Sequence, residues 1–393
     1  MIKKNIYLDN AAATPLDKKV FSIMQPYLVS EYANPSSVYG AGRKNKTALD
    51  NARSIVAKIL GAKKNEIIFT AGATESINLA LQGIAKTFNN TEIVSTNIEH
   101  DAVLGPLRFL KSQNHQIKLI PVKKNGIIDL DQFIKTINNQ TVLVSVNYAN
   151  HEIGTIQPIA EIGKQITKIR SERIKHHIKL PLYFHTDASQ AGLLDLHVSR
   201  LGVDLMSLNG AKIYGPKQSG CLYIRTGVKI QPIIYGGGQE RNLRSGTENI
   251  ANDVGFAIAL ELIQQTRTAE NKRQKELRDY LITRIESSNL KGFLNGDRSK
   301  RLNSNLNFTF FNIDGEALVM ALDQFGIAVS TGSACSVGQT ESSHVLRAIG
   351  LSEKNANSSL RITLGKQNIK ADLDYLIKVL PKAIALARKV SAR

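Results

Sequence analysis

Two polar side chains that could hold a cofactor directly follow predicted strands of the chain. Asp187 comes just after the apolar run at residues 182–185, and Lys212 follows the run at 204–208. Open α/β sheets bind ligands at the carboxyl ends of their strands. A carboxylate there could pair with a protonated ring nitrogen, although it could also simply cap a helix. A lysine there can form a Schiff base if its ammonium is partly desolvated, although a lone lysine usually belongs to a solvated surface. Together, the two are the fixed groups that pyridoxal phosphate needs.

A turn and a histidine could complete such a site. A short strand is predicted at residues 66–70, followed by the glycine-containing turn 71–74 and a helical pattern. Backbone amides at a helix N-terminus, together with the Thr74 hydroxyl, can bind a phosphate. His100 closes another predicted strand, where an imidazole could stack on a cofactor ring or shuttle protons. Neither feature is specific alone, because such turns are common and a single histidine is more often structural.

The elements that must position these residues alternate strands and helices. Near-continuous apolar or β-branched runs at residues 92–96, 117–120 and 142–146 are typical of parallel strands buried on both faces. This pattern predicts an α/β domain with a mostly parallel sheet. A charged helical stretch runs from about Asn249 to about Ser288, and an α+β pattern follows it. The predicted division is a large domain of residues 15–261 and a small α+β domain of residues 1–14 and 262–393.

The composition narrows the class of protein. The chain has 393 residues, of which 42% are hydrophobic, which is enough for a full core and excludes a disordered chain. No apolar run approaches the roughly 20 residues that a membrane span needs. The N-terminus lacks the apolar region of a signal peptide, so we expect a cytoplasmic protein without membrane attachment. The two cysteines, Cys221 and Cys335, exclude a disulfide framework and a four-ligand zinc site, and we expect no metal.

The charge is strongly positive, with 51 Lys and Arg against 33 Asp and Glu. Such a balance can indicate acidic partners or nucleic acid. The basic residues are densest at residues 164–179, but no aromatic side chains for base stacking are interleaved with them, and the chain has no Trp. We therefore expect a solvated, lysine-rich surface there and no nucleic-acid binding as a main role.

In order and spacing, these segments resemble the cysteine desulfurases of the NifS/IscS type, within the class V aminotransferase family. The resemblance runs nearly from end to end of the chain. Its landmarks are residues 7–15, 34–37, 72–76, 99–100, 212–217, 244–247, 332–335 and 343–347.

This resemblance implies fold type I of the pyridoxal phosphate enzymes and a homodimer. Lys212 would form the Schiff base with the cofactor, Asp187 would face the ring nitrogen, His100 would stack on the ring, and Gln190 would face the ring hydroxyl. The phosphate would be held by Thr74 and the preceding backbone at Ala73, with help from positions 209 and 211. A loop from residue 236 onward would carry Thr247 to the phosphate of the other subunit. Asn34 and Arg361 would bind the substrate carboxylate, a task that suits the arginine fork.

Cys335 decides the activity that the resemblance implies. It lies in a small, polar, glycine-rich segment, as a reachable nucleophile should, whereas Cys221 lies in a strand-like run. In the implied reaction Lys212 takes the Cα proton of L-cysteine, and the Cys335 thiolate attacks the substrate sulfur. L-alanine leaves, and Cys335 keeps a persulfide. A sulfur acceptor protein or scaffold would collect that sulfur for iron–sulfur clusters or another sulfur-transfer pathway.

Three positions depart from the family pattern. Ala211 stands where a histidine is usual, and Asn209 replaces a usual serine; both positions normally help to hold the phosphate. The resemblance also implies that Asn150 contacts the cofactor. His151 replaces an asparagine in the motif that begins at Asn150, so His151 would be the residue at the ring hydroxyl. The basic segment 164–179 looks like an insertion. Two alternatives stay open: another class V enzyme, such as a selenocysteine lyase or a transaminase, and a cofactor-bearing RNA-binding protein without turnover.

Overall fold

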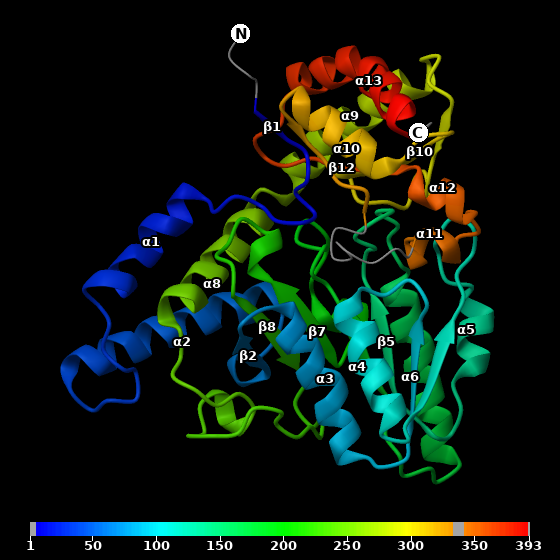
Figure 1. Ribbon diagram of the computed structural model, residues 1–393. Helices are drawn as coiled ribbons and strands as arrows, with labels where there is room; N and C mark the ends of the chain where they lie inside the picture. The colour runs from blue at the N-terminus through cyan, green and yellow to red at the C-terminus, as the bar shows by residue number, and fades with distance from the viewer. Residues whose placement is uncertain (1–4, 333–341, 392–393) are drawn as a thin grey trace.

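A seven-stranded sheet forms the centre of the protein in the computed structural model, which describes residues 5–332 and 342–391 (Figure 1). In spatial order its strands are β2 (Ile67–Thr70), β8 (Gly220–Ile224), β7 (Leu205–Asn209), β6 (Tyr183–Asp187), β5 (Thr141–Asn147), β3 (Glu92–Thr96) and β4 (Gln116–Ile120). Strand β8 runs antiparallel to both of its neighbours, and all other pairs are parallel. The predicted strands are thus confirmed to within two residues at each end.

Helices cover both faces of this sheet. One face carries α2 (Gly40–Leu60), α5 (Leu130–Thr136), α6 (Ile159–Lys175), α7 (Val198–Leu201) and α8 (Ile250–Gln265), and the other carries α3 (Ala73–Thr87) and α4 (Asp101–Ser112). Alternate strand residues point to opposite layers. In β2, Ile67 and Phe69 belong to the core on the α2 face, whereas Ile68 belongs to the core on the α3 face. Burial on both faces explains the continuous apolar runs.

A smaller α+β unit lies above the sheet in Figure 1 and is built from both ends of the chain. Its three antiparallel strands are β12 (Ser359–Thr363), β10 (Asn305–Phe310) and β9 (Gly292–Leu294), and β1 (Ile6–Tyr7) pairs with β11 (Ile327–Ala328) beside them. Its helices are α9 (Arg267–Glu286), α10 (Gly315–Gln324) and α13 (Lys370–Ser391). The short helices α11 (His344–Ala348) and α12 (Glu353–Asn357) lie at its edge. The domain boundaries given above stay a prediction.

The charged stretch predicted from about Asn249 to about Ser288 is two helices rather than one. Helix α8 ends at Gln265 and α9 begins at Arg267, with Thr266 between them at φ −93° and ψ 1°. The Thr266 hydroxyl donates to the carbonyl of Leu262 at 3.0 Å. Local bonds of this kind compete with the regular helix pattern.

The basic segment at residues 164–179 is only partly a solvated surface, so that expectation is wrong for its two arginines. Lys168 is exposed, but Arg173 on α6 is buried and its guanidinium donates to the carbonyls of Asn138, Thr141 and Leu180. Arg170, also on α6, pairs with a buried aspartate of the sheet layer, Asp204. The segment is therefore built into the fold, because its arginines tie α6 to the starts of the central strands β5, β6 and β7.

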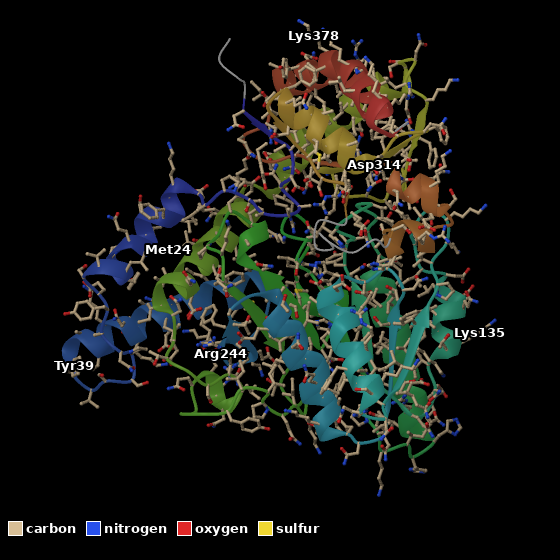
Figure 2. All side chains as sticks on the ribbon, in the orientation of Figure 1. Met24, Tyr39, Lys135, Arg244, Asp314 and Lys378 are labelled. Carbon is tan, nitrogen blue, oxygen red and sulfur yellow. The ribbon has the colours of Figure 1, made fainter. Side chains whose placement is uncertain are left out.

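Helices α1 (Lys18–Val29) and α2 form an arm that projects to one side of the molecule (Figure 1). Tyr39, labelled in Figure 2, lies at the far tip of this arm, in the connection between the two helices. Among the described residues, no helix combines the length and the apolar character needed to cross a membrane.

Candidate active site

A cavity of about 380 Å³ lies at the carboxyl ends of β5, β6 and β7. Ligand pockets typically enclose roughly 300–1,000 Å³, so a small cofactor and substrate fit. The cavity brings together nine of the predicted site residues, namely Ala73, Thr74, His100, His151, Asp187, Gln190, Asn209, Lys212 and Arg361.

Lys212 reaches the cavity from a single 3₁₀ turn, η2 (Gly210–Lys212), that directly follows β7. Asn209, the last residue of β7, caps this turn because its Oδ1 accepts from the Ala211 amide at 3.1 Å. The Lys212 Nζ donates to the carbonyl oxygen of Ala12 at 2.5 Å, a contact between the large sheet and the N-terminal segment. The lysine is therefore held at a fixed place rather than on a solvated surface.

Asp187 is the last residue of β6, and its side chain is buried. One carboxylate oxygen, Oδ1, accepts from the Ser189 amide at 2.9 Å and from the Ser189 hydroxyl at 2.5 Å. No helix starts here among the described residues, since the next one after β6 is α7, so Asp187 is not a helix cap. Gln190 is fixed beside it by donating to the carbonyl of Ala11 at 3.1 Å.

The turn between β2 and α3 offers free amides to the cavity. Gly72 caps α3 at φ +135° and supplies no side-chain cap, so the amides of the first turn, which includes Ala73 and Thr74, have no partner within the helix. A Cβ at Gly220 would lie 2.4 Å from the Leu208 carbonyl and 2.9 Å from the Gly72 Cα. Glycine at 220 therefore lets this turn sit against the sheet.

His100 and His151 meet edge to face in the cavity, with ring centroids 4.8 Å apart. His100 caps α4, because its Nδ1 accepts from the Ala102 amide at 3.0 Å. Burial lowers the pKa of His100, and the nearby Lys212 acts in the same direction. Burial, with His100 and Arg361 nearby, lowers the pKa of His151 well below its usual value. Both imidazoles are thus neutral near pH 7.

Two buried carboxyl groups lie just behind these histidines. Burial raises the pKa of Glu99 to about 8, and its Oε1 accepts from the Thr96 hydroxyl at 2.6 Å and the Asn147 amide at 3.0 Å. Burial also raises the pKa of Glu152, whose Oε2 accepts from the Ser343 hydroxyl at 2.5 Å. With a pKa of about 8, the Glu99 carboxyl is protonated near pH 7 and adds little negative charge behind the cavity.

Arg361, on β12, brings a buried guanidinium from the small unit into the cavity. Its Nη2 donates to Asp9 Oδ1 at 2.8 Å, its Nη1 donates to the His151 carbonyl at 3.2 Å, and its Nε has no partner among the described residues. Asp9 orients this guanidinium, a role that the sequence did not predict. Its position in the landmark segment 7–15 was the signal that could have drawn attention to it.

The structure does not bring the other predicted residues into the cavity wall. The Asn150 side chain is buried: its amide nitrogen donates to the Ile98 carbonyl, and its Oδ1 accepts from two backbone amides. Ala211 lies beside the wall, with its carbonyl bound to the Thr14 amide. Asn34 and Thr247 are exposed on loops. Cys335 lies outside the described residues.

Comparisons with known proteins agree with this geometry. The aminotransferase class-V family model matches residues 6–376. The chain is 44% identical over 393 residues to a cysteine desulfurase IscS of Dictyoglomus turgidum, covering 99% of this chain and 97% of that protein. It is 42% identical over 393 residues to a cysteine desulfurase IscS of Methanosarcina thermophila, covering 99% and 94%.

Solved structures show the same fold. A NifS-like protein superposes with a TM-score of 0.89 at 35% identity, over 97% of this chain and 100% of that one. SspA in complex with cysteine superposes with a TM-score of 0.77 at 34% identity, over 93% of this chain and 100% of that one. The resemblance seen in the sequence and the expected α/β fold class, fold type I of the pyridoxal phosphate enzymes, are both confirmed. The chain belongs to the aminotransferase class-V family.

Proposed function

We propose that the protein is a pyridoxal phosphate-dependent cysteine desulfurase that converts L-cysteine into L-alanine and leaves a persulfide on Cys335. The observation that carries the proposal is one cavity that holds Lys212, Asp187, His100 and Arg361 together. Relatives at 42–44% identity that bear the name cysteine desulfurase support it, as does a solved relative in complex with cysteine.

The residues of the cavity fit this cofactor. Lys212 can bind its aldehyde, Asp187 can face its ring nitrogen through Oδ2, and the first turn of α3 with Thr74 offers amides and a hydroxyl to its phosphate. When bound, the cofactor supplies an electron sink for loss of the substrate Cα proton.

The chain's own residues then divide the remaining work. The Arg361 guanidinium binds the substrate carboxylate, and its unpartnered Nε gives it a free donor for that purpose. Lys212 carries the Cα proton. His100 uses Nδ1 to cap α4, which leaves Nε2 to exchange a proton in the cavity. The Cys335 thiolate attacks the substrate sulfur, the carbon–sulfur bond breaks, and the sulfur is kept as a persulfide for an acceptor protein.

The functional unit that we propose is a homodimer. The arm formed by α1 and α2 exposes large apolar side chains, and a second copy of the chain is the occupant expected to cover them. They are Leu28, Val29, Tyr32, Val38 and Tyr39, with 56–85% of each side chain exposed. Asn34 is exposed in the same connection between α1 and α2, and Thr247 is exposed on another loop. Both predicted site residues would then serve a site shared between subunits. Light scattering that found an active, cofactor-loaded monomer would overturn the dimer.

The test of the proposed activity has two parts. Borohydride reduction followed by peptide mapping should place the pyridoxyl group on Lys212; the nearby Lys217 is the natural internal control, and label there would contradict the assignment. The purified protein should also release alanine from L-cysteine. Faster release from selenocysteine, or amino-group exchange with keto acids, would instead favour a selenocysteine lyase or a transaminase. Cofactor without turnover would favour the RNA-binding alternative.

A further inference from the structure

The segment at residues 234–248, between β8 and α8, holds an unusual backbone. Glu240, Arg241 and Asn242 have φ values of 46°, 59° and 62° in succession. Residues other than glycine rarely adopt this left-handed region, and they persist there only where the surroundings hold them. Three such residues in a row therefore indicate a turn that its neighbours fix in place.

A buried ion pair supplies that hold. Arg53 on α2 binds the Glu240 carboxylate through both terminal nitrogens of its guanidinium: Nη2 donates to Oε1 at 2.5 Å and Nη1 to Oε2 at 2.8 Å. The Phe69 amide of β2 donates to the same Oε2 at 2.8 Å. The side chains of Arg53 and Glu240 are only 11% and 4% exposed, so this two-pronged contact is largely shielded from water. The turn is thus anchored to the sheet layer.

A second pair ties the same segment to the candidate phosphate turn. The Arg244 Nε donates to Glu75 Oε1 at 2.9 Å, and Glu75 Oε2 accepts from the Ala71 amide at 3.1 Å. Glu75 is in the first turn of α3, next to Thr74. Figure 2 labels Arg244 in the part of the molecule that holds the large sheet, away from the small unit. Arg244 therefore touches the turn that faces its own subunit's cavity.

The segment also fixes the residue just before Thr247. The Gln239 side chain accepts from the Gly246 amide at 2.9 Å, and the Gly238 amide donates to the Ser245 hydroxyl at 3.4 Å. These bonds fold the segment onto itself, so the contacts of Glu240 and Arg244 with the rest of the subunit also determine the position of Thr247. Thr247 itself is exposed.

We propose that Arg244 is a positioning residue that couples the two active sites of the dimer. Through Glu75, it fixes the 234–248 segment to the phosphate turn of its own subunit. By fixing this segment, it also fixes Thr247 at the active site of the partner subunit. The inference rests on the proposed function, in which Thr247 binds the phosphate in the other subunit. Its consequence is that an altered Arg244 in one subunit weakens cofactor retention in the other.

Mixed dimers with differently tagged subunits test this directly. One subunit is wild type, and the other carries Lys212→Ala, so that the cofactor can be trapped by borohydride only on the wild-type Lys212. Adding Arg244→Gln to the Lys212→Ala subunit should speed cofactor loss from the wild-type site roughly 5- to 30-fold after dilution, which corresponds to about 1–2 kcal/mol of lost positioning. Glu75→Gln in the same subunit should give the same acceleration, and Arg244→Lys should restore part of the retention.

A matched control is Arg200→Gln, which breaks another two-pronged pair, with Asp195, outside the cavity. It should leave retention unchanged. Equal rates of loss with and without Arg244→Gln, in dimers that light scattering shows to be intact, would overturn the inference while leaving the proposed function standing. A protein that never dimerises would overturn both the dimer and the inference, and an absence of label on Lys212 would overturn the proposed cofactor site.

Discussion

Asn209 has two tasks that a single substitution can separate. Its Oδ1 caps the turn that carries Lys212, and its side chain also lines the cavity. Asp caps a helical turn about as well as Asn, so Asn209→Asp should change the free energy of unfolding of the apoprotein by less than about 0.5 kcal/mol. The carboxylate, however, replaces the amide nitrogen that can donate to a phosphate. A hydrogen bond to a charged group contributes about 1.5–3 kcal/mol, so affinity for pyridoxal phosphate should fall roughly 10- to 150-fold.

The assay is an equilibrium titration of the apoprotein with pyridoxal phosphate, alongside urea unfolding of the same preparation. Asn209→Ala should lose both affinity and about 1 kcal/mol of stability, because it also removes the cap. Asp129→Asn makes the opposite exchange at the cap of α5, outside the cavity, and should leave the affinity unchanged. Wild-type affinity in Asn209→Asp would refute the idea that this side chain meets the phosphate.

Other substitutions test the structure away from the phosphate. Arg173→Met should lower the free energy of unfolding in urea by about 2–4 kcal/mol, because three carbonyls lose their donor. Lys168→Met, on the exposed face of α6, should lower it by less than about 0.5 kcal/mol. Equal losses would mean that Arg173 is solvated. Folded Glu99 keeps its proton to about pH 8, whereas an unfolded glutamate loses its proton near pH 4.3, so the free energy of unfolding falls as pH rises between those values. Glu99→Gln removes this titration and should make the fall shallower. An unaltered slope would contradict the raised pKa of Glu99. Burial raises the pKa of the Cys221 thiol, so Cys221→Ser should leave alanine production unchanged; a large loss would mean that this cysteine takes part in the reaction.

The sequence predicted the part of the site that depends on local position. Asp187 and Lys212 could be found because one ends a buried strand and the other follows the next strand, and the carboxyl ends of neighbouring parallel strands lie at one edge of a sheet. The turn before α3 was predictable for the same reason, since glycine and the helix pattern mark it. Where local pattern decides the structure, the predicted strands agree with the observed ones.

Features that depend on distant partners were not predictable in this way. Arg361 is oriented by Asp9, which is 352 residues away in the chain, and no spacing rule connects the two. Arg173 belongs to a basic run, and only its position against the strand ends shows that it is buried. The break at Thr266 contains neither glycine nor proline, so the sequence offered no signal for it.

The most direct test of the proposed desulfurase activity is the mass of the Cys335 peptide after a single turnover with L-cysteine. We expect one added sulfur on that peptide and one alanine released. Cys335→Ser should still bind the cofactor and the substrate, because those steps need Lys212, Asp187 and Arg361, but it should fail to transfer sulfur, since a hydroxyl is a far weaker nucleophile than a thiolate. If Cys335→Ser made alanine from L-cysteine at the wild-type rate, or the added sulfur never appeared on Cys335, the protein would not be a cysteine desulfurase of this type.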